Sequence, residues 1–117
     1  MSPEKVRRKD APPPIYVLSG GSGASGRQIV ETALAQFPEF RAPVVVRDRV
    51  HTLERAEAVL TEARADGGAV VHTLVDAALR KPFIRLAAKL GVATIDLMGP
   101  LLEQLEARSE AKPLGQP

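Results

Sequence analysis

The 117-residue chain contains no cysteine, which excludes disulfide bridges and thiolate chemistry and leaves the cytoplasmic location that we predict. Aromatic residues make up only 3%, so the core must consist of aliphatic side chains, and a base-stacking platform for single-stranded nucleic acid is not expected. No apolar run approaches the roughly 18 residues of a membrane-spanning helix. The formal net charge is only +2. We therefore expect neither nucleic acid nor a membrane as a partner.

Chain length and composition indicate one small globular domain with two flanking segments. Hydrophobic residues account for 44% and charged residues for 26%, which is ordinary for such a domain. Residues 1–14 are charged and end in three prolines, which predicts a disordered basic and proline-rich arm. Residues 15–108 are predicted to form the α/β domain. Residues 109–117 are polar and proline-rich, and we interpret them as a linker towards a further domain.

The most informative stretch joins a short apolar run to an amphipathic helix through a glycine–serine loop. Ile15–Leu18 predicts a strand, and Ser19–Gly26 contains four glycines and three serines. Ser25 followed by Gln28 fits a capping box, so the helix is predicted to begin within the loop. Helix N-termini attract anions because their first N–H groups lack partners and the helix dipole favours negative charge. The helix is expected to bury a stripe formed by Ile29, Val30, Ala33, Leu34 and Phe37.

The glycine spacing alone does not identify a nucleotide site. Gly21 and Gly26 have the spacing of a P-loop, but Arg27 and Gln28 follow where Lys and Ser or Thr are required. The dinucleotide-binding pattern G-x-G-x-x-G also matches, yet only Asp48 stands at roughly the right offset for its acidic residue. The alternative is a tight strand-to-helix connection without a ligand. The anion- or nucleotide-binding candidates are Ser19, Gly20, Gly21, Ser22, Gly23, Ser25, Gly26, Arg27 and Arg47.

The rest of the chain alternates between predicted strands and helices. Strands are expected at 44–46, 69–75 and 92–97, with helices from Thr52 to Asp66, from about Lys81 to Leu90, and after Gly99-Pro100. Asp76 is expected to cap only a short turn, because Pro82 suits the first position of a helix. This alternation predicts a three-layer α/β sandwich whose four-stranded parallel sheet has the flavodoxin-like or Rossmann-like order 2-1-3-4.

Secondary site candidates follow the predicted second and third strands. Arg47 and Arg49 stand at the carboxyl end of the second strand, where parallel sheets bind ligands, although a solvated loop is the competing interpretation. His72 and Thr73 lie in the third strand and are candidates for the same crevice. A half-buried, hydrogen-bonded histidine is the alternative for His72. No cysteine, histidine or acidic spacing indicates a metal site.

Four segments together resemble one protein family. They are the Ile15–Ser19 run with its glycine loop, Ala33–Pro38, Val71–Val75 and Ile95–Leu102. The ordered set resembles the N-terminal half of the regulatory proteins of phosphoenolpyruvate synthase and of pyruvate, phosphate dikinase. The resemblance covers residue 15 to about residue 117.

The resemblance implies a bifunctional serine/threonine kinase and phosphorylase of the cytoplasm. Such a protein phosphorylates a threonine of its target enzyme with ADP, and removes that phosphate with inorganic phosphate, releasing pyrophosphate. The implied ligands are ADP or another nucleotide such as ATP, phosphate and magnesium. The implied partners are the target enzyme and a missing C-terminal P-loop domain. A homodimer is a further expectation.

This chain departs from the family pattern in two ways. The family loop reads Ser-Asp-x-Thr-Gly-Glu-Thr-Ala, whereas Gly20 and Ala24 replace both carboxylates, and Ser22 and Ser25 replace the threonines. The family's P-loop lysine lies in the absent half, so we expect no catalytic residue and no transferase activity in this chain. Target recognition or interdomain contact is the expected role. The alternatives are a free-standing phosphate- or nucleotide-binding module and a structural interaction domain.

Overall fold

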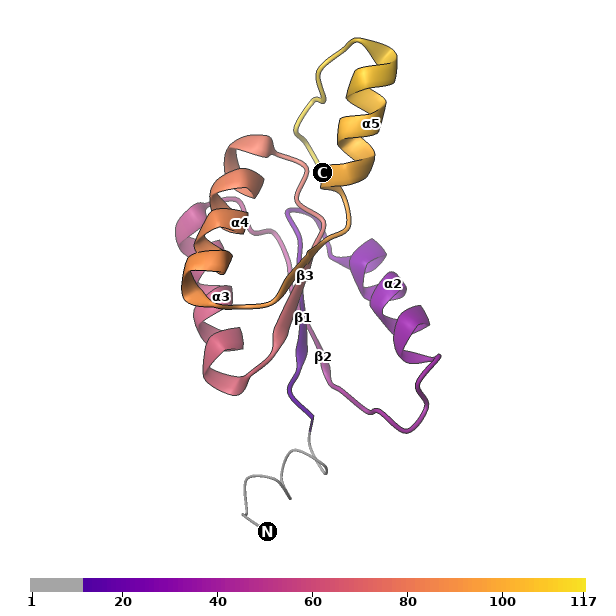
Figure 1. The fold of residues 1–117 in the computed structure, drawn as a ribbon, viewed down its shortest axis with the longest axis vertical. Coiled ribbons are helices and arrows are strands. Elements are labelled where there is room, and N and C mark those ends of the chain that lie inside the picture. Colours follow the sequence, from indigo (N-terminus) through magenta and orange to yellow (C-terminus); the bar gives the residue numbers. More distant parts are fainter. Residues whose placement is uncertain (1–11) are drawn as a thin grey trace.

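The computed structural model describes residues 12–117, so most of the predicted basic arm lies outside the described residues. Strands and helices alternate along the whole described chain, as predicted (Figure 1). Their bounds are β1 (Ile15–Leu18), α2 (Ala24–Leu34), β2 (Val44–Arg47), α3 (Leu53–Asp66), β3 (Ala69–His72), α4 (Ala77–Leu90), β4 (Thr94–Asp96) and α5 (Gly99–Ser109).

The four strands form one parallel sheet in the order β2-β1-β3-β4, which confirms the predicted topology. Helices α3 and α4 cover one face of the sheet, and α2 lies on the other (Figure 1). Helix α5 projects beyond the carboxyl edge of the sheet rather than packing beside α2. Within residues 12–117, no helix has the length and apolarity needed to cross a membrane.

The two faces of the sheet are packed unequally. Strand side chains alternate between the faces, and the buried cluster on one face is much larger than that on the other. Leu18 and Val70 face α3 and α4, where they join Leu60 and Phe83 in a fully buried cluster. On the α2 face the buried cluster is small and consists of Val17, Val30 and Val71. The larger core therefore holds the sheet to α3 and α4.

Local capping signals set the bounds of α3 and α4. Thr52 accepts a hydrogen bond from the Arg55 N–H, and Asp76 accepts one from the Ala78 N–H. Gly67 and Gly91 end these helices in the left-handed conformation. The predicted cap at Thr52 and both glycine stops are confirmed.

Five local predictions are wrong. Strand β3 ends at His72, so Thr73, Leu74 and Val75 lie beyond it. Of the apolar stripe predicted for α2 only Val30 is buried, and Phe37 lies beyond the end of the helix.

The other three wrong predictions concern the bounds of helices and strands. Helix α2 begins at Ala24, with Gly23 as its cap, so the capping box of Ser25 and Gln28 does not form. Helix α4 begins at Ala77 and contains Pro82, because Asp76 caps the full helix and the buried Phe83 holds it against the sheet. Strand β4 comprises only Thr94–Asp96, the residues that pair with β3 at the sheet edge, and not the whole of residues 92–97.

Candidate functional site

The glycine–serine loop connects β1 to α2 at the carboxyl edge of the sheet, and two of its glycines are required by geometry. Gly23 has a φ of 82°, and a Cβ atom there would lie 2.6 Å from Val46 Cγ1. At Gly26 a Cβ atom would lie 2.8 Å from Val17 Cγ1, so glycine lets α2 approach the sheet closely. These glycines thus allow a sharp entry into α2.

Hydrogen bonds fix the loop and leave part of the helix N-terminus open. The Gly21 N–H donates to Ser19 Oγ over 3.0 Å, and the Ala24 N–H donates to Ser22 Oγ over 3.3 Å. Within residues 12–117, no group accepts a hydrogen bond from the N–H of Ser25 or Gly26. Two donors of the first turn are therefore available to an anion.

A pocket of about 260 Å³ lies over this loop. Thr73, Val75 and Met98 form part of its wall, together with Gln116 and Pro117 from the C-terminal tail. No side chain in the wall is charged; the remaining lining residues are Ser19, Gly21, Ser22, Gly23, Ala24 and Ser25. The pocket therefore offers backbone N–H groups and hydroxyls to a ligand, without a basic side chain.

The arginine candidates are engaged elsewhere. Arg27 Nε lies 2.7 Å from Glu31 Oε1 on the exposed side of α2. Arg47 turns towards α3, where its Nη2 lies 2.7 Å from Glu62 Oε2, and its guanidinium carbon lies 5.8 Å from the centre of the Tyr16 ring. The hydrogen bond from Arg47 lowers the pKa of the Glu62 carboxyl.

Arg49 and Gly20 lie beside the pocket without lining it. The Arg49 N–H donates to the Gly21 carbonyl, while the Arg49 side chain is 66% exposed beside Asp48. A Cβ atom at Gly20 would lie 3.6 Å from Pro117 Cγ. The backbone that follows β2 therefore supports the loop, while its basic side chains stay outside the pocket.

The side chains of His72 and Thr73 have different surroundings. Thr73 lines the loop pocket, whereas His72 is fully buried against the α4 side with its ring centre 5.0 Å from that of Phe83. Neither ring nitrogen has a hydrogen-bond partner within residues 12–117, so the half-buried, hydrogen-bonded histidine is a wrong interpretation. Burial lowers the pKa of His72 and outweighs the nearby carboxylate.

A buried ionic cluster beside His72 was missed by the sequence reasoning. Asp96 Oδ1 accepts hydrogen bonds from the N–H groups of Met98 at 3.0 Å and Gly99 at 2.7 Å, and lies 4.0 Å from His72 Nδ1. Arg80 Nη1 lies 3.4 Å from Asp96 Oδ2. Burial raises the pKa of Asp96, but the two backbone hydrogen bonds, together with the neighbouring His72 and Arg80, outweigh burial, so the pKa is lowered overall.

Only the acidic member of this cluster has a signal in the sequence. Asp96 stands just before Gly99-Pro100, where an acidic side chain can cap the following helix. The partner Arg80 lies on α4, sixteen residues away, and no local pattern connects the two. The cluster orients the start of α5.

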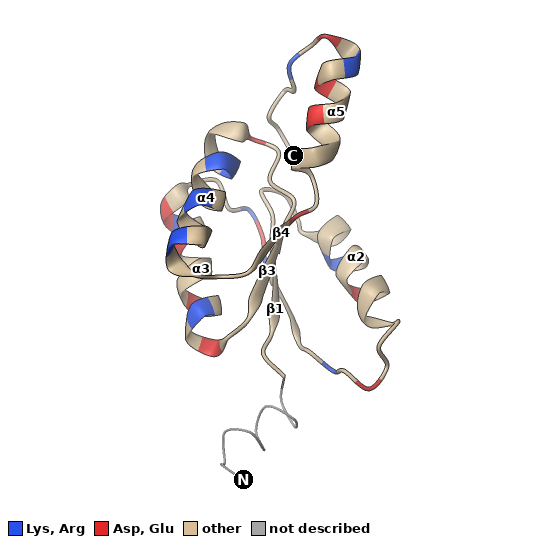
Figure 2. Ribbon diagram, in the orientation of Figure 1, with Lys and Arg blue, Asp and Glu red and all other residues tan. Residues whose placement is uncertain are grey.

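An apolar groove of about 510 Å³ lies on the α2 face of the sheet. Phe37 is 64% exposed and Ile95 is 54% exposed. Charged residues are spread over α3, α4 and α5, whereas α2 carries one opposite pair (Figure 2). The wall of the groove is wholly apolar and consists of Ile15, Ile29, Val30, Ala33, Leu34, Phe37, Phe40, Val71, Ile95 and Leu97.

Comparison with known proteins identifies the family of the chain. The model of the kinase/pyrophosphorylase family matches residues 15–117, which include all eight elements. The chain belongs to this family. The resemblance stated from the sequence is thereby confirmed.

The curated relatives are named as regulatory proteins of pyruvate, phosphate dikinase. A pyruvate, phosphate dikinase regulatory protein of Chloroflexus aurantiacus is 38% identical over 105 residues, which are 90% of this chain and 38% of that protein. A protein of the same name from Sorangium cellulosum is 34% identical over 88% of this chain and 37% of its own length. One from Listeria monocytogenes is 32% identical over 90% and 38%. The chain thus spans less than two fifths of these relatives.

Proposed function

We propose that this chain is the N-terminal domain of a regulatory kinase and phosphorylase of pyruvate, phosphate dikinase or of phosphoenolpyruvate synthase. The observation that carries the proposal is the family match across the whole α/β domain. The names of the relatives support a dikinase as the target. The reactions proposed for the complete protein are phosphorylation of a target threonine with ADP and its phosphate-dependent reversal, with magnesium at the phosphates.

In this proposal the chain contributes recognition rather than phosphoryl transfer. Phosphoryl transfer requires positive charge at the transferred group, and the loop pocket has no basic side chain in its wall. The arginines nearest in sequence are paired with Glu31 and Glu62. The apolar groove around Phe37 and Ile95 is the surface that supports contact with the target or with a further domain.

A binding and activity assay with the 117-residue chain tests this function. Isothermal titration with a purified pyruvate, phosphate dikinase is expected to show binding, while mass spectrometry after incubation with ADP and magnesium is expected to show no phosphothreonine. Phe37→Ser is expected to weaken binding at least about tenfold, because its ring is 64% exposed in the groove.

Leu53→Ser is the matched control, since Leu53 is an exposed apolar residue at the start of α3. Phosphothreonine produced by this chain alone would overturn the division between recognition and catalysis. Absence of binding to both a dikinase and a phosphoenolpyruvate synthase would overturn the recognition role.

The second candidate is an anion-binding module that works at the glycine–serine loop. It is favoured by the unpartnered N–H groups of Ser25 and Gly26, beside the pocket that Thr73 lines. An NMR titration with ADP and then with inorganic phosphate tests it. Saturable shifts confined to residues 20–27 would support the module, and flat spectra at millimolar ligand would leave the loop as a connection only.

A further inference from the structure

One side of the α2 face is left without a covering helix. Val17, Val71 and Ile95 are paired neighbours in β1, β3 and β4, and all three side chains lie on this face. Their exposed fractions are 0%, 6% and 54%. Helix α2 packs against β2, β1 and β3, so the cover is lost towards β4.

The handedness of the connections explains this gap. Connections between parallel strands are right-handed, so the direction of movement across the sheet decides which face the helix occupies. The chain moves one way from β1 to β2, and the other way from β2 to β3 and from β3 to β4. Helix α2 therefore lies on one face, and α3 and α4 lie on the other (Figure 1).

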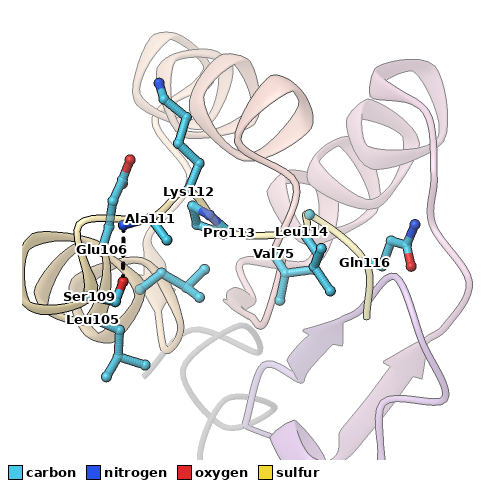
Figure 3. Close-up of a pocket in the computed structure, with 11 residues that line it drawn as sticks. Val75, Leu105, Glu106, Ser109, Ala111, Lys112, Pro113, Leu114 and Gln116 are labelled. Atoms are coloured by element: carbon cyan, nitrogen blue, oxygen red, sulfur yellow. Dashed lines mark hydrogen bonds between the residues drawn. The ribbon is translucent and has the colours of Figure 1, made fainter.

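Helix α5 does not fill the gap. It begins at Gly99, after β4, and projects beyond the carboxyl edge of the sheet (Figure 1). Leu102 and Leu105 of α5 line a separate pocket of about 260 Å³, which Val75 also lines (Figure 3). No residue of α5 belongs to the wall of the apolar groove.

The groove has the shape and chemistry of a seat for an amphipathic helix. It is a hollow of about 510 Å³ whose lining residues are all apolar. The charged residues of α2 nearest to it, Arg27 and Glu31, pair with each other at 2.7 Å. All-parallel sheets carry helices on both faces, and the apolar stripe of such a helix matches an uncharged hollow.

The length of the relatives indicates where this helix comes from. The 105 matched residues are 38% of the Chloroflexus aurantiacus protein, so the larger part of that protein lies outside the match. A second copy of the present chain fits the groove less well. Two identical hollows that face each other leave their volume unfilled, whereas stable interfaces are close-packed.

We propose that the groove is the seat of an amphipathic helix from the part of the complete regulatory protein that lies outside these 117 residues. The helix lies beside α2, over β3 and β4, and covers Ile95. The inference rests on the proposed function in that the chain is one domain of a longer protein. It leaves Phe37, beyond the end of α2, for contact with the target.

Isoleucine methyl groups report directly on occupation of the groove. The chain has four isoleucines. Ile15, Ile29 and Ile95 line the groove, whereas Ile84 lies on α4 and packs against the core of the other face. The methyl-labelled 117-residue chain is titrated with the part of the Chloroflexus aurantiacus protein outside the match. Saturable NMR shifts are expected for the three groove methyl groups and not for Ile84.

A charge in the groove gives the corresponding variant. Ile95→Asp is expected to weaken this binding at least about tenfold, because an apolar helix cannot pair with a buried carboxylate. Leu101→Asp is the matched control, since Leu101 is 56% exposed and lies on α5 outside the groove. An unchanged Ile84 signal in both variants verifies that the main core is intact.

A fused chain provides a second measurement that does not require binding between separate molecules. In it, residues 1–117 continue into the same part of the Chloroflexus aurantiacus protein. A soluble gadolinium chelate is expected to broaden the Ile95 methyl signal in the 117-residue chain, and this broadening is expected to be lost in the fused chain. Protection of Ile95 in the fused chain alone would retain the inference. Exposure of Ile95 in the fused chain, together with flat titrations, would overturn it.

The outcomes separate this inference from the proposed function. Groove shifts with the relative's segment, without binding to a dikinase or to a phosphoenolpyruvate synthase, would retain the helix seat and overturn the recognition role. Groove shifts that appear when the 117-residue chain alone is concentrated would assign the groove to a second copy. Groove shifts with a purified dikinase, and none with the relative's segment, would assign it to the target. Either of the last two results would overturn the inference.

Discussion

At Gly23 the backbone is left-handed, with a φ of 82°, and a side chain would also meet Val46. Gly91 has a similar φ of 72°, but no atom from another part of the described residues 12–117 lies within 4 Å of the position that a Cβ would occupy. The two glycines therefore share one kind of backbone strain and differ in the space around them. This pair can separate the strain of the loop from its close packing.

Gly23→Ala is expected to lower the free energy of unfolding by about 2–4 kcal/mol, because left-handed strain and the contact with Val46 both act. Gly91→Ala is the control and is expected to lower it by only about 1 kcal/mol through strain. Urea denaturation followed by circular dichroism measures both. Equal losses would show that Val46 moves away without cost.

The fully buried His72 has a pKa lowered by burial, so its imidazole is neutral in the folded chain. Below the unfolded pKa of about 6.5, the unfolded chain binds a proton that the folded chain does not bind. The free energy of unfolding is therefore expected to be highest above that pH and to fall as the pH decreases below about 6.5. Urea midpoints at pH 7.5, 6.5 and 5.5 measure this loss.

His72→Leu is expected to flatten the dependence between pH 7.5 and 5.5, while the exposed His51 replaced by glutamine is expected to retain it. NMR of the unsubstituted chain gives a second measurement, because the His72 ring signal must titrate below its ordinary pKa. A titration of His72 at or above 6.5 would contradict the assignment of a neutral buried ring.

Among the elements, α4 combines strong end signals with an unfavourable interior residue. Asp76 caps its start and Gly91 ends it, yet Pro82 lies inside and has no N–H to donate. Burial of Phe83 and Ala87 against the sheet compensates for the lost hydrogen bond. Tertiary packing therefore decides that α4 is one continuous helix.

Pro82→Ala is expected to raise the free energy of unfolding by about 1–3 kcal/mol, because it restores a backbone donor in the helix interior. Lys81→Ala, one residue earlier, is the control and is expected to change stability by less than about 0.5 kcal/mol. Urea denaturation measures both variants. A loss of stability in Pro82→Ala would mean that the proline is favourable at this position.

For the whole molecule, the main consequence of the layering is the difference between the two faces of the sheet. Phe83 is fully buried under α4, whereas Phe37 is 64% exposed at the end of α2. Helix α5 does not cover the open face: it begins at Gly99, whose N–H donates to Asp96 Oδ1, and projects past the edge of the sheet (Figure 1). The α2 face is thus the open side of the domain.

Phe83→Ala is expected to lower the free energy of unfolding by about 3–5 kcal/mol, because it leaves a cavity in the main core. Phe37→Ala is expected to change it by less than about 0.5 kcal/mol, since its ring is mostly in water. The urea midpoints of the two variants give the comparison. Similar losses at both positions would show that the α2 face is covered in solution.

Local signals were sufficient for most elements and insufficient for the site. Helix α3 begins after Thr52 and ends at Gly67. The hydrogen bond of Thr52 and the left-handed φ of Gly67 depend only on neighbouring residues. The start of α4 was placed too late because the packing of Phe83, which offsets Pro82, is not a local property. The cluster of His72, Arg80 and Asp96 joins three elements, so no single stretch indicates it.

The sequence by itself determined the alternation of strands and helices, because hydrophobic periodicity and caps act over short distances. That alternation then predicted the order of the parallel sheet, and the ordered set of motifs indicated the family. Only the tertiary structure decided which candidate side chains meet. Arg47 turns to Glu62 and away from the loop, Thr73 enters the pocket that His72 does not reach, and Pro117 lies over Gly21. Side-chain direction and contacts between distant segments depend on packing in three dimensions, which residue spacing does not encode.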